Sequence, residues 1–173
     1  FNTHREAGRY LPAGLHTITG QTGGGKTAAV VNLAYAALRA RHPVVYVSLE
    51  LDAPELAARL LALEAELPWS ALALRRPMNH PDAIAKRDAG ITALTDPARR
   101  SVALVPDGNV GFSALATNLR ATVLRVWADT DRKRAPLVIF DYLQAAGILS
   151  PGGAQQESSL REHISAVAME LRR

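Results

Sequence analysis

Residues 20–27 of this chain read GQTGGGKT, and this glycine-rich stretch carries the strongest signal for its fold class. The pattern G-x-x-x-x-G-K-[ST] forms a loop whose backbone N–H groups surround a phosphate while the lysine reaches its oxygens. Its fixed positions are occupied here by Gly20, Gly25, Lys26 and Thr27. A flexible turn ahead of a helix is the alternative for so many glycines. Context separates the two, because a phosphate loop needs a strand entering it and a helix leaving it.

The sequence on either side of the loop supplies both elements. Residues 15–19 (LHTIT) are short and rich in β-branched side chains, which predicts a buried strand entering the loop. Residues 28–41 are dense in Ala and Leu, which predicts a helix whose N-terminus favours an anion, with the Thr27 hydroxyl offered to Mg²⁺. We therefore interpret the stretch as a nucleotide-binding loop formed by Gly20, Gln21, Thr22, Gly23, Gly24, Gly25, Lys26, Thr27 and Ala28.

The length and composition of the chain limit the class of protein to which such a loop can belong. With 173 residues and 48% hydrophobic content, the chain can bury one sizeable core, so we expect a single domain over residues 1–173. The absence of cysteine excludes disulfides and thiolate metal sites. No signal segment opens the chain and no apolar run approaches a membrane span, so we expect a cytoplasmic protein without a membrane partner. A net charge of +4 leans toward a polyanionic partner.

Short apolar segments alternate with helix-forming segments along the rest of the chain. Further strands are predicted at residues 44–49, 101–105 and 137–140, and helices at 53–66, 81–94, 112–128 and from about 160 onward. Continuous apolar strands separated by helices are typical of a parallel sheet covered on both faces, so the predicted fold class is α/β. Residues 150–159 (SPGGAQQESS) are polar and are predicted to form a loop.

Polar side chains follow two of these strands at the edge where ligands of open α/β sheets collect. Asp141 follows an apolar strand, where its carboxylate can hold Mg²⁺ through the metal's water shell or can simply cap a turn. Gln144 can sense a γ-phosphate or cap the same loop. Glu50 can accept a proton from the water that attacks a phosphate, or can be a polar residue at a helix start.

Three segments together resemble the RecA-like ATPase core of DnaB-type replicative DNA helicases: GQTGGGKTAAVVNLAYAA, VVYVSLELDAPELAARLLA and PLVIFDYLQ. The resemblance runs from about residue 11 to 144 and more loosely to the end. It implies a RecA-like P-loop NTPase core, a mainly parallel sheet flanked by helices, that binds and hydrolyses ATP with Mg²⁺. The roles it implies are Lys26 on the phosphates, Thr27 and Asp141 on Mg²⁺, Glu50 as catalytic base, Gln144 coupling the γ-phosphate to a DNA-binding loop, and Arg59 in a structural or subunit contact.

The same resemblance implies partners. The chain would act in a homo-oligomeric ring, a hexamer, that moves on single-stranded DNA, and the residues expected to contact that DNA are Gly152, Gly153, Gln155 and Gln156. Gln21 and Thr22 stand where the family has Arg-Pro, and further strands, a second DNA loop and an arginine finger would follow Arg173, so the chain looks like the N-terminal part of the core. A RecA/KaiC-like ATPase without helicase activity and an ATP-regulated binding module remain as alternatives.

Overall fold

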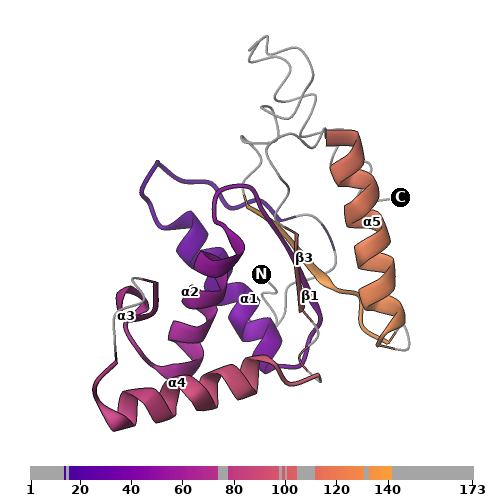
Figure 1. Cartoon of the computed structure of the whole chain (residues 1–173). Helices are drawn as coiled ribbons and strands as arrows, with labels where there is room; N and C mark the ends of the chain where they lie inside the picture. The colour runs from indigo at the N-terminus through magenta and orange to yellow at the C-terminus, as the bar shows by residue number, and fades with distance from the viewer. Residues whose placement is uncertain are drawn as a thin grey trace, which may run out of the picture.

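The computed structural model of this chain describes residues 14, 16–73, 78–97, 99, 101–104, 112–130 and 133–141. The described helices and strands alternate along the sequence, and their arrangement can be followed in Figure 1. In chain order they are α1 (Lys26–Arg39), β1 (Val44–Ser48), α2 (Ala53–Ala65), α3 (Trp69–Ala73), α4 (Pro81–Leu94), β2 (Ser101–Leu104), α5 (Phe112–Ala128) and β3 (Leu137–Asp141).

The three described strands form a parallel sheet in the order β2-β1-β3. In the central strand, Val45 pairs with Val102 on one side and Val138 on the other. Every residue of β1 is buried, which explains why this strand is a continuous apolar run and not an alternating one. Burying one valine side chain fully stabilises the fold by about 1.5–3 kcal/mol, so β1 is a main contributor to stability.

The pleat of the sheet divides its side chains between two hydrophobic clusters. Tyr46 and Ile139 belong to the cluster that includes α1 and the start of α2. Val45 and Val47 point the other way and pack with α5. Figure 1 shows the resulting layers, with α1 and α2 on one side of the strands and α5 on the other. Helices on both faces are what a buried parallel sheet requires.

Helices α2 and α4 approach each other closely. Asp52 caps the start of α2, because its Oδ1 accepts a hydrogen bond from the Glu55 backbone N–H at 2.7 Å. A Cβ atom placed on Gly90 of α4 would lie 2.9 Å from Leu61 Cδ1 and 3.2 Å from Ala65 Cβ on α2. The absence of a side chain at Gly90 therefore permits this helix contact.

The α/β class and the parallel arrangement predicted for the later strands are confirmed. The prediction of a strand entering the glycine loop is wrong, because residues 16–20 have no strand structure and are exposed. Ile18, the apolar side chain expected inside, is 48% exposed. β-branched residues favour strands where the side chains can pack on a sheet surface, and here that burial is missing. The predicted loop at 150–159 and the last helix lie outside the described residues.

Candidate nucleotide-binding site

The glycine loop ahead of α1 has backbone geometry that depends on glycine. Gly23 and Gly25 have φ angles of 76° and 79°, in the left-handed region that side chains disfavour. Gly24 N–H donates to the Gln21 carbonyl at 3.0 Å, and a Cβ atom on Gly24 would lie only 2.9 Å from that oxygen. Residues 21–25 are exposed, so the loop is open to a ligand from solvent.

Lys26 is the first residue of α1 and turns its side chain back along the loop. Its Nζ donates to the Gly20 carbonyl at 2.9 Å and to the Gln21 carbonyl at 2.8 Å. These contacts hold a positive charge beside the loop and the N-terminus of α1, where the helix dipole also favours an anion. An ammonium group carries three N–H donors that can be redirected, so these carbonyl contacts can be exchanged for phosphate oxygens.

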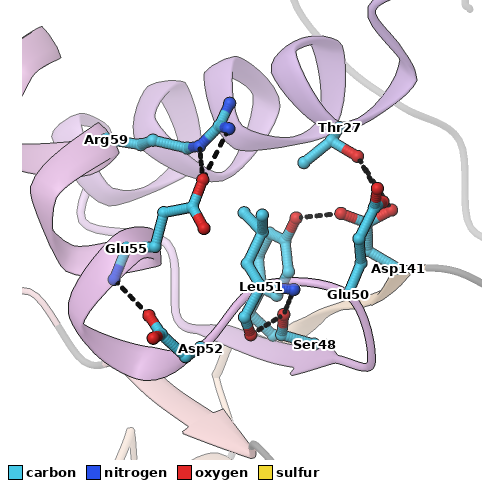
Figure 2. A network of polar contacts seen from close by, with 9 residues as sticks. Thr27, Ser48, Glu50, Leu51, Asp52, Glu55, Arg59 and Asp141 are labelled. Atoms are coloured by element: carbon cyan, nitrogen blue, oxygen red, sulfur yellow. Dashed lines mark hydrogen bonds and ion pairs between the residues drawn. The ribbon is translucent and has the colours of Figure 1, made fainter. Parts of the chain in front are cut away.

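Three polar side chains from distant parts of the sequence meet next to this loop (Figure 2). The Thr27 hydroxyl donates to Glu50 Oε2 at 3.1 Å and lies 3.5 Å from Asp141 Oδ1. The sheet explains the meeting, because Ser48 at the end of β1 pairs with Asp141 at the end of β3. The Leu49 backbone N–H then donates to the Asp141 carbonyl at 2.7 Å, which continues the pairing to the residue before Glu50.

A tight turn after β1 directs Glu50 toward the loop. The Ser48 hydroxyl donates to the Leu51 carbonyl at 2.6 Å and accepts from the Leu51 N–H at 3.0 Å, and both residues are buried. Asp52, and not Glu50, caps the helix that follows. Ser48 was not among the site residues predicted from the sequence; the available signal was a hydroxyl residue at the end of a mainly apolar strand.

Asp141 is a buried carboxylate with a second partner, Tyr46, that was not predicted from the sequence. The Tyr46 hydroxyl donates to Asp141 Oδ2 at 2.7 Å, and the two residues are only 3% and 4% exposed. Burial, together with the neighbouring carboxylate of Asp141, raises the pKa of Tyr46 well above its ordinary value. Tyr46 therefore stays protonated and acts as the donor. A tyrosine among the valines of β1 was the signal in the sequence.

Arg59 on α2 makes contacts within its own layer. Its Nη2 lies 2.8 Å from Glu55 Oε1, and its guanidinium carbon lies 5.0 Å from the centre of the Trp69 ring. Figure 2 shows Arg59 and Glu55 pointing toward each other above the start of α2. Arg59 therefore has a structural role, linking α2 to the following α3, while a subunit contact stays a prediction.

The oxygen atoms of this cluster suit a Mg²⁺ ion that is bound alongside a phosphate group of a ligand. Thr27 supplies a hydroxyl and Asp141 a carboxylate, which are the hard oxygen ligands that Mg²⁺ prefers, and the carboxylate of Glu50 lies beside them. Mg²⁺ is usually bound through one or two carboxylates plus waters and substrate phosphates, not in a cage made only of protein groups. The described residues contain no group of three or more His, Cys, Asp or Glu that could hold a metal ion.

The remaining predicted site residues fall into two groups. Gln144 and the four residues expected to contact DNA, Gly152, Gly153, Gln155 and Gln156, lie outside the described residues. Thr22 and Ala28 are exposed at the loop and on the first turn of α1.

Fold and site together define an α/β domain whose glycine-rich loop opens at the carboxyl ends of parallel strands, the usual ligand edge of such sheets. Comparison with known families then identifies the chain more closely: the family model of the DnaB-like helicase C-terminal domain matches residues 7–173, and the chain belongs to that family. This is a family of helicases with a RecA-like fold, and the parallel sheet with helices on both faces is consistent with it. A search of curated proteins found no match.

None of the helices that the structure describes combines the length and the apolar character needed to cross a membrane.

Proposed function

We propose that this chain is the ATP-hydrolysing motor domain of a ring helicase, one subunit of a hexamer that moves on single-stranded DNA. Membership of the DnaB-like family supports the helicase and ring parts of this proposal. The observation that carries the ATPase part is the meeting of Thr27, Glu50 and Asp141 beside the glycine loop, from positions 23 and 114 residues apart. A loop that served only as a turn would not require this cluster.

In the proposed mechanism the loop binds the phosphates and Lys26 neutralises part of their charge. The Lys26 ammonium leaves the Gly20 and Gln21 carbonyls, which it contacts at 2.9 and 2.8 Å, and donates to phosphate oxygens. The first backbone N–H groups of α1 have no acceptor within the helix, and they would donate to the same anion.

The three side chains of the cluster have different roles in the proposed reaction. When bound, Mg²⁺ would neutralise charge on the phosphate oxygens, and the residues that would hold it are Thr27 and Asp141. The exposed carboxylate of Glu50 accepts a proton from the attacking water. Before that step Glu50 accepts the Thr27 hydroxyl at 3.1 Å, so ligand binding must release Glu50 as well as Lys26 from contacts within the protein.

The first experiment is calorimetry of Mg-ATP binding to the wild-type chain, Lys26→Ala and Lys86→Ala. Lys86 is an exposed lysine on α4 and controls for loss of one positive charge. Truncating one partner of a charge pair costs about 2–5 kcal/mol, so Lys26→Ala is expected to weaken binding by roughly 30-fold or more. Lys86→Ala should bind as the wild type does. Equal affinities for all three proteins would contradict the assignment of the loop.

The second experiment separates a motor from a module that only binds nucleotide. Glu50→Gln keeps the shape of the side chain and removes its basicity, so it should bind Mg-ATP and lose turnover, with and without single-stranded DNA. Turnover that survives in Glu50→Gln would remove Glu50 from the catalytic role. ATP-driven strand separation by the assembled ring would separate a helicase from a related ATPase without that activity.

A further inference from the structure

The buried pair of Tyr46 and Asp141 has a role beyond the contacts described above. We propose that Tyr46 is a positioning residue: its hydroxyl fixes the Asp141 carboxylate so that Mg²⁺ can strengthen nucleotide binding at the loop. This inference rests on the proposed function, because it assigns a residue to the same site. Tyr46 does not touch the nucleotide; it acts through its hydrogen bond to Asp141.

The register of the sheet brings the two side chains together. Tyr46 on β1 pairs with Ile139 on β3, and both belong to the cluster that packs against α1. Asp141 lies two residues beyond Ile139, so its side chain is on the same face of the sheet. The tyrosine side chain is long enough to reach diagonally from β1 to the end of β3, and its hydroxyl lies 2.7 Å from Asp141 Oδ2.

Because of that hydrogen bond, the two carboxylate oxygens of Asp141 have different neighbours. Oδ2 accepts from Tyr46, while Oδ1 lies 3.5 Å from the Thr27 hydroxyl, on the side of the glycine loop. Asp141 is 4% exposed, so water cannot substitute freely for a lost partner. With Oδ2 held from inside the protein, the carboxylate cannot rotate without breaking a short charge-assisted hydrogen bond.

Packing alone does not account for the tyrosine. Its ring lies in an apolar cluster with Val31, Ala34 and Leu38 of α1, where a phenylalanine ring would fill the same space. The hydroxyl adds a buried polar group, which is favourable only when it has a partner. Asp141 is that partner, because the Tyr46 hydroxyl donates to Asp141 Oδ2 at 2.7 Å.

The test measures how much Mg²⁺ strengthens the binding of a non-hydrolysable ATP analogue, by calorimetry with and without Mg²⁺. Removing an outer partner of a metal-binding carboxylate commonly reduces metal affinity 10–100-fold. We expect Tyr46→Phe to lower the Mg²⁺ enhancement about tenfold or more and to leave the Mg²⁺-free affinity unchanged, because Lys26 and the loop are intact. Tyr35→Phe is the matched control: it removes the hydroxyl of a tyrosine on α1 whose charged neighbours are Glu64 and Arg39, and not Asp141.

A second comparison ties the effect to the carboxylate. In an Asp141→Asn background, Tyr46→Phe should have no further effect on the Mg²⁺ enhancement, since a residue that acts through Asp141 cannot act without it. An undiminished enhancement in Tyr46→Phe, or the same loss in Tyr35→Phe, would overturn the proposal. So would an equal weakening with and without Mg²⁺.

Two further outcomes are distinguished by the same experiment. If Tyr46→Phe does not fold, Tyr46→Met tests the same site with a flexible apolar side chain; failure of both to fold while Tyr35→Phe folds would assign Tyr46 a structural role and overturn the proposal. If the wild-type chain binds no nucleotide, the proposed function fails and this inference fails with it. If the wild-type chain shows Mg²⁺ enhancement and Tyr46→Phe retains it, only this inference fails.

Discussion

The ion pair between Glu64 on α2 and Arg99, just ahead of β2, should contribute measurably to the stability of the fold. Arg99 Nη1 donates to Glu64 Oε2 at 2.7 Å and Nη2 donates to Oε1 at 3.3 Å, a two-point contact with the carboxylate. The side chains are only 17% and 14% exposed. Because β2 is an end strand among those described, this pair anchors the segment entering it to a helix on one face of the sheet.

Replacing Glu64 by glutamine should lower the free energy of unfolding at neutral pH by about 2–3 kcal/mol. A hydrogen bond to a charged group contributes about 1.5–3 kcal/mol, and breaking a fully buried pair costs about 3–5 kcal/mol. Because both side chains keep some exposure, the expected loss lies within the first range and below the second. The amide keeps one acceptor for Arg99 but removes the negative charge, so the guanidinium is left partly buried without its counter-ion.

The pH dependence provides the sharper test. The hydrogen bonds from Arg99 lower the pKa of Glu64 in the folded protein below its ordinary value, although burial opposes them. A depressed carboxyl pKa gives stability that is complete above the unfolded value of about 4.3 and is lost as the pH falls through the folded pKa. The difference between wild type and Glu64→Gln should therefore be full at pH 7 and shrink below about pH 4.

Urea unfolding followed by circular dichroism, at pH 7 and at several values down to pH 3, measures this difference. Glu66→Gln is the control, since Glu66 is an exposed glutamate two residues further along. It should unfold at nearly the wild-type urea concentration at each pH. A stabilising role for this ion pair is refuted if the urea midpoint for Glu64→Gln equals that of the wild type at pH 7, or if the difference between the two midpoints is the same at pH 3.

Three further substitutions test the turn, the loop and the helix contact. Ser48→Ala leaves the Leu51 N–H buried without its acceptor, so the free energy of unfolding should fall by about 1–3 kcal/mol in thermal unfolding, and ATP turnover should fall because Glu50 is misdirected. An unchanged melting temperature would argue against this role of the Ser48 hydroxyl. Gly24→Ala sets a Cβ atom 2.9 Å from a backbone oxygen, so nucleotide affinity measured by calorimetry should drop about tenfold while far-UV circular dichroism stays the same. Gly90→Val overpacks the contact with α2 and should destabilise the fold by about 1–3 kcal/mol in urea unfolding, a result contradicted by a midpoint at or above the wild-type value.

Much of the local structure follows from features that neighbouring residues share. The helix predicted at residues 81–94 is observed as Pro81–Leu94, and the one predicted at 112–128 is observed as Phe112–Ala128. A proline at the first helical position favours the start of the first of these helices, and the apolar period of the second predicts its extent. The glycine loop is equally local, because left-handed φ angles at Gly23 and Gly25 are a property of glycine itself.

The strand predicted at residues 15–19 shows the limit of local information. Its β-branched side chains match strand propensity, yet residues 16–20 are exposed and have no strand structure. A strand is stabilised by pairing with a neighbouring strand and by burial against another layer, and a stretch of five residues specifies neither of these. Residues 44–48 and 137–141, with the same kind of composition, form strands because they pair with each other and are covered by helices.

The sequence alone placed candidate side chains at the ends of two strands, but their relations to one another required the folded sheet. Thr27, Glu50 and Asp141 meet because β1 and β3 are parallel neighbours in a fixed register. The partnership of Tyr46 with Asp141 depends on the same register and joins residues 95 positions apart. Propensity and motif spacing act over a few residues, whereas a hydrogen bond across strands depends on which faces pack together, and that is settled only when the whole core is buried.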